Sequence, residues 1–118
     1  MKKIISVLMV FLLVGCGNNY KTISAAEAHD MLNDNKDVVI IDVRNYDEYQ
    51  EEHIENSINV PLNHINDIEM DKDTKIIVYC LSGVRSKQAA KTLVSLGYFN
   101  VYNIDGGIIN WGYELVSE

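Results

Sequence analysis

Residues 76–86 read IIVYCLSGVRS, and this stretch determines how the rest of the chain is interpreted. Its first four residues, IIVY, form a continuous apolar run, which is typical of a strand buried on both faces of a sheet. A loop that contains Gly83 follows, and apolar residues then recur at helical spacing through Val94. This order of strand, loop and helix predicts one unit of an α/β fold.

Similar units lie on either side of this stretch. Residues 38–41, 58–60 and 101–104 are further apolar runs, and each predicts a strand. Because these runs alternate with segments of helical pattern, we expect a parallel sheet with helices on both of its faces.

The predicted helices have recognisable ends. Residues 24–27, SAAE, form a capping box, which predicts a helix that extends to about Asn33. Gly97 is suited to end the helix that follows Gly83. Residues 106–107, both glycine, are expected to open a last helix that carries Trp111 as a core residue.

Composition sets the limits of the function. The chain has 118 residues, with 10 Lys and Arg, 17 Asp and Glu, and a formal net charge of −7. This length accommodates one domain. Such an acidic chain should repel nucleic acid and anionic lipid headgroups, so neither is expected as a charge-driven partner. We also expect a monomer without a cofactor or a metal.

The amino-terminal segment has the layout of a secretory signal. Lys2 and Lys3 precede an apolar stretch over residues 4–14, which is short for a spanning helix of about 20 residues. The Gly15-Cys16 pair that follows resembles the bacterial lipobox, whose cysteine is lipidated and becomes the new amino terminus. The alternative is an uncleaved membrane anchor in which Cys16 has no role.

The lipobox resemblance implies a division of the chain into three parts. Residues 1–15 would be the signal peptide, residues 16–21 a short tether with acyl chains such as palmitate on Cys16, and residues 22–118 the domain. Without the signal, 8 basic residues remain against 17 acidic ones. Lipid chains rather than charge would then hold the domain, outside the cytoplasm, at the bacterial cell membrane.

Cys16 and Cys80 are the only cysteines in the chain. If Cys16 is lipidated, Cys80 has no intramolecular partner, and it is either a buried small hydrophobe or a reactive thiol. Its position favours the reactive thiol, because ligands of open α/β sheets bind beyond the carboxyl ends of the strands. Backbone N–H groups of residues 81–86 and the start of the next helix should lower the pKa of the thiol. Gly83 would let the backbone curl around the sulfur, and Arg85 could bind an oxyanion.

With these residues in place, the chain resembles the rhodanese family of sulfurtransferases. The specific element is the CxxGxR loop, residues 80–85, after its buried strand. Weaker matches follow in the family's order: Asp42-Val43-Arg44, Glu48-Tyr49, His53-Ile54, Asn59-Val60-Pro61, and Gly106-Gly107 with Trp111. The resemblance implies a parallel sheet of about five strands, with a short strand near residues 20–23. It also implies a catalytic Cys80 that cycles between thiolate and persulfide.

The same resemblance implies small-molecule partners and a set of site residues. The sulfur donor would be thiosulfate or a persulfide, and the acceptor a thiol or cyanide. Ser82 and Ser86 either donate to the outer sulfur or serve as turn and cap residues. The residues expected to bind the substrate are Leu81, Ser82, Gly83, Val84, Arg85 and Ser86.

Three departures from the family pattern bear on this interpretation. Leu81 stands where many thiosulfate-using members carry a basic residue, which leaves Arg85 as the main anion binder with Lys87 nearby. Thiosulfate as the natural donor is therefore in question, whereas sulfur transfer is not. Glu52 replaces the usual glycine before a histidine, and residues 56–57, Asn-Ser, replace Gly-Ala as a tolerated loop change.

Other polar residues have structural interpretations. Asp42 and Arg44 are expected to brace the loop as a charged pair at the strand ends. His53 is expected to support the loop rather than act as a base, because persulfide exchange needs no base once the thiol is ionised. His29 and His64 are interpreted as solvent-facing helix residues.

Two other classes of function are open. A cysteine-dependent phosphatase or arsenate reductase needs five residues between its cysteine and arginine, whereas four separate Cys80 from Arg85. The shorter loop suits one sulfur atom better than a phosphate. The non-enzymatic alternative is a sulfur carrier or an idle binding module; idle domains usually lose the cysteine, and this chain keeps it.

Overall fold

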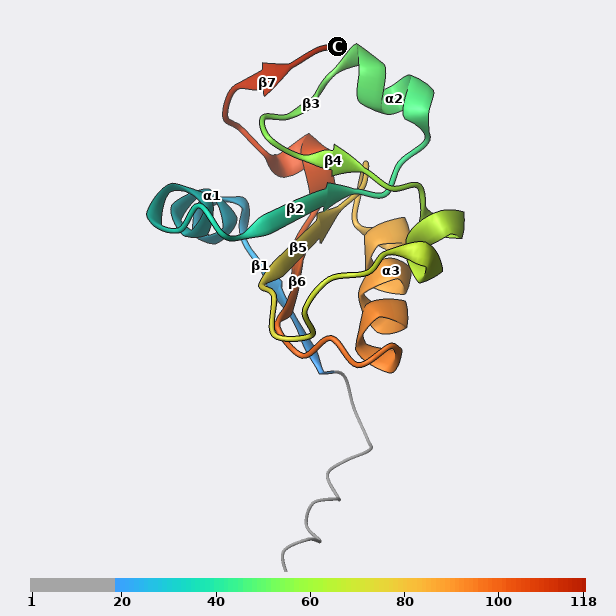
Figure 1. Cartoon of the computed structure of the whole chain (residues 1–118). Coiled ribbons are helices and arrows are strands. Elements are labelled where there is room, and N and C mark those ends of the chain that lie inside the picture. Colours follow the sequence, from blue (N-terminus) through green and yellow to red (C-terminus); the bar gives the residue numbers. More distant parts are fainter. Residues whose placement is uncertain (1–18) are drawn as a thin grey trace, which may run out of the picture.

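Five strands form one parallel sheet in the order β1-β6-β5-β2-β4 (Figure 1). The computed structural model describes residues 19–118, so the expected signal segment 1–15 and Cys16 lie outside the described residues. Every pair of neighbouring strands is parallel, which confirms the predicted fold class and strand number. The strands are β1 (Tyr20–Ile23), β2 (Val39–Asp42), β4 (Ile58–Asn59), β5 (Ile76–Tyr79) and β6 (Val101–Ile104).

Helices cover both faces of the sheet, as predicted. Helix α1 (Ala25–Asp34) packs on one face, while α3 (Val84–Ser95) and the 3-10 helix η2 (Leu62–Asp67) pack on the other (Figure 1). The capping box of α1 forms as expected, with the Glu27 N–H donating to Ser24 Oγ at 3.0 Å. No helix within residues 19–118 has the length and apolar character that crossing a bilayer requires.

Strand β5 divides the core into two halves, because its side chains alternate between the faces of the sheet. Ile76, Val78 and Cys80 belong to the apolar cluster under α3. Ile77 and Tyr79 belong to the cluster under α1, which also contains Trp111 at 3% exposure, a core residue as predicted. Burying one such aliphatic side chain contributes about 1.5–3 kcal/mol to the free energy of unfolding. Because β5 places buried side chains in both clusters, both halves of the core depend on this strand.

The structure contains elements that the sequence pattern did not predict. Helix α2 (Tyr46–Glu51) has no buried residue, so no apolar stripe marked it in the sequence. Strands β3 (His53–Ile54) and β7 (Leu115–Val116) pair antiparallel at the carboxyl edge of the main sheet (Figure 1). Two-residue strands are too short to show an alternating pattern.

The last predicted helix is wrong in type and extent. Gly106 and Gly107 do open a helical turn, but it is the short 3-10 helix η3 (Gly107–Asn110), and Trp111 lies just after it. Both glycines adopt positive φ angles, 75° and 61°, and this geometry turns the chain sharply instead of starting an α-helix.

Candidate active site

Cys80 lies where β5 ends, and the loop to α3 wraps around its sulfur. The Gly83 N–H donates to Sγ at 3.1 Å and the Ser86 N–H donates at 3.3 Å. The Ser86 hydroxyl lies 3.4 Å from the same sulfur. The predicted cradle of backbone N–H groups therefore exists in the structure.

These contacts shift the titration of the thiol. Burial alone raises the pKa of Cys80, because it disfavours the charged form. Hydrogen bonds from the Ser86 side chain and from the backbone of Ser86, Gly83 and Ser82 outweigh burial, so the pKa of Cys80 lies below its ordinary value. The thiolate, which is the nucleophilic form of cysteine, is therefore more accessible at Cys80 than in an ordinary cysteine.

Two glycines give the loop its shape for different reasons. Gly83 has a φ of 108°, in the left-handed region that residues with a Cβ rarely adopt. Gly107 packs directly on the loop, and a Cβ there would lie 2.6 Å from the carbonyl oxygen of Leu81 and nearer still to that of Cys80. This close approach allows the N–H groups of Ile108 and Ile109 to bond those two carbonyls, at 2.9 and 3.2 Å.

Ser86 is fixed by a residue that sequence reasoning missed. The side chain of Asn103, fully buried on β6, forms a hydrogen bond with Ser86 Oγ. Thr22 Oγ1 on β1 lies 3.4 Å from the same amide group. An amide within the apolar run 101–104 was the available signal, because a buried polar side chain requires a partner.

Arg85 does not project freely toward the sulfur. Its guanidinium makes two hydrogen bonds with the Glu48 carboxylate of α2, at 2.9 and 3.2 Å. The bond from Arg85 lowers the pKa of Glu48, and the bond to Glu48 raises the pKa of Arg85, so both groups stay charged. Glu48 entered the sequence analysis as part of a family motif, without a role at the site.

The outer rim of the loop is apolar. Leu81 is 43% exposed and Val84 is 72% exposed. Ile109, 67% exposed, is held beside them by the hydrogen bond of its N–H to the Leu81 carbonyl. Lys87 is exposed on α3 and has no ion-pair partner among residues 19–118.

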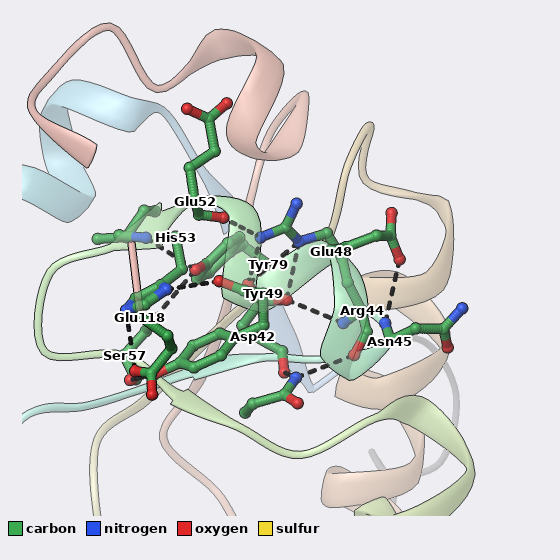
Figure 2. Close-up of polar contacts among 12 residues, drawn as sticks. Asp42, Arg44, Asn45, Glu48, Tyr49, Glu52, His53, Ser57, Tyr79 and Glu118 are labelled. Atoms are coloured by element: carbon green, nitrogen blue, oxygen red, sulfur yellow. Dashed lines mark hydrogen bonds and ion pairs between the residues drawn. The ribbon is translucent and has the colours of Figure 1, made fainter. Parts of the chain in front are cut away.

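The Asp42–Arg44 pair is buried at the end of β2 and contacts the end of α2 (Figure 2). Arg44 donates to both carboxylate oxygens of Asp42, at 2.7–3.1 Å, and to the Glu52 carbonyl at 2.7 Å. Asn59 donates to the carbonyls of Asp42 and Arg44 at 3.0 and 2.9 Å. The pair thus fixes the end of α2. It also borders Tyr79, the residue before Cys80, because the Arg44 guanidinium carbon lies 5.9 Å from the centroid of the Tyr79 ring.

His53 packs against α2. It is buried, its ring stacks on Tyr49 with centroids 3.7 Å apart, and Nδ1 lies 2.7 Å from the Tyr49 carbonyl oxygen (Figure 2). Nε2 lies 4.0 Å from a carboxylate oxygen of Glu118. His53 therefore joins α2 to the carboxyl-terminal segment, and no hydrogen bond within residues 19–118 links it to the Cys80 loop.

The remaining histidines differ from each other. His64 is exposed on η2, as expected. His29 is only partly exposed, because its ring stacks on Tyr113 with centroids 3.8 Å apart, so its interpretation as a solvent-facing residue was wrong. Within residues 19–118, no three side chains of His, Cys, Asp or Glu gather closely enough to hold a metal ion.

Two further departures from the rhodanese pattern, at Glu52 and at residues 56–57, are explained by the local structure. Glu52 has a φ of −167°, which is extended backbone open to any residue, so no glycine is needed there. Asn56 has a φ of 70°, in the left-handed region that asparagine tolerates better than most residues. Ser57 is buried, and its hydroxyl lies 3.0 Å from that of Tyr79.

Comparison with known families and proteins agrees with this geometry. The sequence model of the rhodanese-like domain matches residues 24–114. A thiosulfate sulfurtransferase GlpE of Coxiella burnetii is 37% identical over 94 residues, which cover 78% of this chain and 87% of that protein.

Another relative and a solved structure extend the comparison. A tRNA uridine(34) hydroxylase of Erwinia tasmaniensis is 38% identical over 97 residues, or 75% of this chain, and the match spans only 27% of that protein. A rhodanese-related protein from Thermoplasma volcanium superposes with a TM-score of 0.74 at 34% identity. That superposition covers 84% of this chain and 100% of the other.

Proposed function

Because this chain belongs to the rhodanese-like domain family, we propose that it moves a sulfane sulfur from a donor to a thiophilic acceptor through a Cys80 persulfide. The hydroxylase relatives carry the shared region as about a quarter of their length. The relative of matching length is named a thiosulfate sulfurtransferase. A sulfur-transfer activity that resides within the single domain is therefore the better supported alternative.

The proposed reaction has two displacement steps at sulfur. In the first, the Cys80 thiolate attacks the outer sulfur of the donor, the bond between that sulfur and the rest of the donor breaks, and the donor remainder leaves with the electron pair. Sulfite is the leaving group if the donor is thiosulfate. In the second, a thiolate or cyanide attacks the outer sulfur of the persulfide and regenerates the Cys80 thiolate. No net oxidation or external proton is required.

The observation that supports this proposal most directly is the set of hydrogen bonds to Sγ. Donors at Gly83, Ser86 and Ser82 stabilise a negative charge on the sulfur. We expect the same N–H groups to stabilise the persulfide anion as well. The loop between Cys80 and Arg85 has four residues, one fewer than a cysteine phosphatase needs, so a tetrahedral phosphate is the poorer match.

The test is intact mass spectrometry of the soluble domain from residue 18, after incubation with thiosulfate or glutathione persulfide. We expect a gain of one sulfur atom, its loss on addition of cyanide, and no gain in Cys80→Ser. Repeated release of thiocyanate would establish turnover, as distinct from a carrier that loads once. Absence of an adduct with every donor, together with hydrolysis of an aryl phosphate, would contradict the proposal.

We also propose that the domain is anchored outside the cytoplasm through lipid on Cys16. This proposal rests on the sequence pattern of residues 1–16 alone. Two acyl chains are about what stable anchoring requires, and the acidic domain offers no electrostatic attraction to anionic headgroups.

A further inference from the structure

We propose that Glu48 determines which sulfur donors the site accepts, by neutralising Arg85. The inference rests on the proposed sulfur transfer and narrows its donor class. It assigns to this protein a donor of low charge, with an apolar group next to the sulfur, in preference to a small dianion such as thiosulfate. Glu48 acts through Arg85 and is a specificity residue, not a catalytic one.

The first step of the argument concerns charge repulsion. The nucleophile is an anion, and every sulfane donor of the thiosulfate type is also an anion. Their approach is therefore opposed by a Coulomb energy that grows in proportion to the donor charge. A site built for a dianion needs a cation whose charge is not already compensated by a carboxylate.

The second step is that the arginine charge at this site is compensated. Arg85 and Glu48 form a two-point ion pair at 2.9 and 3.2 Å, and the two side chains are equally exposed, at 32%. The chain's other arginine, Arg44, is buried against Asp42 in the same manner. Arg85 can still donate hydrogen bonds from its remaining N–H groups, but together with Glu48 it presents almost no net charge to a donor.

The Glu48 carboxylate is held in this position from a second side. The Asn45 N–H donates to its Oε1 at 3.0 Å as part of the capping box of α2. The helix is itself tied down, because Arg44 binds the Glu52 carbonyl at its end. The ion pair is thus part of the rigid structure of α2 rather than a chance contact between two long side chains.

The third step concerns the rim. Leu81, Val84 and Ile109 expose apolar surface around the loop, at 43%, 72% and 67%. These side chains offer no hydrogen bonds to sulfonate oxygens, whereas they can pack against a carbon-bearing donor. Within residues 80–87, the cation that remains without a carboxylate partner is the exposed Lys87.

The test compares two donors that differ by one charge and one methyl group. Thiosulfate is a dianion, and methanethiosulfonate is the monoanion in which a methyl group replaces one oxyanion. Both give their outer sulfur to Cys80 and release sulfite or methanesulfinate, respectively. We expect wild-type protein to prefer methanethiosulfonate in kcat/KM, with cyanide as the acceptor.

The variant Glu48→Gln removes the negative charge and keeps the capping box, since glutamine serves there equally well. Coulomb energies scale with donor charge, so kcat/KM should rise about tenfold for thiosulfate and about threefold for methanethiosulfonate. Asp47→Asn is the matched control, because Asp47 is an exposed neighbour on the same helix turn without an ion-pair partner in the described chain. It should leave the donor ratio unchanged.

Ionic strength provides a second readout that a purely structural role would not move. Between about 0.01 and 0.15 M salt the screening length falls from about 30 Å to about 8 Å. The advantage of Glu48→Gln over wild type with thiosulfate should shrink accordingly. Equal changes with both donors, or an unchanged donor ratio in a variant with a wild-type melting curve, would overturn this inference and leave sulfur transfer standing. No sulfur uptake by wild type from thiosulfate, methanethiosulfonate or glutathione persulfide would overturn both proposals.

Discussion

The thiolate of Cys80 depends on one residue in particular, Ser86, whose backbone N–H donates to the sulfur and whose hydroxyl oxygen lies 3.4 Å from it. The serine belongs to the first turn of α3, and Asn103 on β6 fixes its rotamer. The nucleophile is therefore tuned by two buried polar residues, Ser86 and Asn103. This arrangement leads to a prediction about pH.

Ser86→Ala should raise the pKa of Cys80, because it removes a hydrogen bond that stabilises the charged form. With less thiolate at neutral pH, the rate of persulfide formation should fall most below the new pKa and recover at alkaline pH. Thiolate absorbance near 240 nm in the domain from residue 18, read against Cys80→Ser, measures the shift. Ser95→Ala, at the exposed end of α3, is the control and should leave the profile in place.

A fall in rate by the same factor at every pH, without a shift in the titration, would contradict this prediction. Such a result would mean that Ser86 contacts the donor or the outer sulfur instead of tuning the thiolate. Of the two roles that the sequence left open for Ser86, donation to the outer sulfur would then be the correct one.

At the residue scale, the sequence predicted the groups within the loop far better than their partners. Cys80, Gly83 and Arg85 are close in sequence, so the spacing of one motif places them together. Glu48 lies 37 positions from Arg85, and Asn103 lies 17 from Ser86. Such pairs form only when the sheet brings separate elements together, and no local pattern encodes the pairing.

At the scale of elements, η3 packs against the active-site loop and holds its backbone in place. Its first residue, Gly107, packs on the carbonyls of Cys80 and Leu81. The N–H groups of Ile108 and Ile109, in the same 3-10 helix, donate to those two carbonyls. The loop is thus held between α3 on one side and η3 on the other. Gly107, which the sequence pattern places at a helix start, is in the structure the point at which η3 contacts the loop.

Gly107→Ala should destabilise the domain and loosen the loop. The added Cβ would overlap two backbone oxygens, and the φ of 61° would be strained for alanine as well. We expect a loss of at least about 2 kcal/mol, and a melting temperature lower by roughly 10 °C, measured by thermal denaturation. Sulfur transfer should fall even at temperatures at which the variant is folded.

Gly97→Ala is the matched control for this substitution. Gly97 also has a positive φ, 104°, but a Cβ there would meet only the flexible Lys72 side chain at 3.7 Å. This variant should lose stability through backbone strain alone and keep normal sulfur transfer. Equal losses of activity in both variants would contradict the role given to η3.

The elements that sequence predicted correctly share one property, which is a dense apolar run or a capping signal. Strands β2, β5 and β6 are largely buried, so hydrophobicity alone marks them. Helix α2 is stabilised instead by its capping box and by the contacts of Glu48 and Glu52. A helix that is held by polar contacts shows no apolar periodicity, and this is why α2 was missed although it carries half of the Arg85 ion pair.

At the scale of the whole molecule, the proposed lipid on Cys16 has a direct test. Cys16→Ala, in the full chain expressed in a bacterium, should release the domain from the membrane fraction or stall its processing, since the proposal attributes attachment to the lipid on this residue. The measurement is fractionation followed by intact mass. The domain from residue 18, which lacks Cys16, is the reference for protein without the lipid. Unchanged membrane association of Cys16→Ala would favour an uncleaved anchor.

Because the strands are parallel, all of their amino ends lie at one end of the sheet and all of their carboxyl ends lie at the other. The chain enters β1 at Tyr20, at the amino end of the sheet, while Cys80 follows β5 at the carboxyl end (Figure 1). A domain held by its start would therefore turn its sulfur away from the lipid surface. Water-borne donors and acceptors would reach it from the open side, whereas a thiol carried within the bilayer would face the wrong end of the molecule.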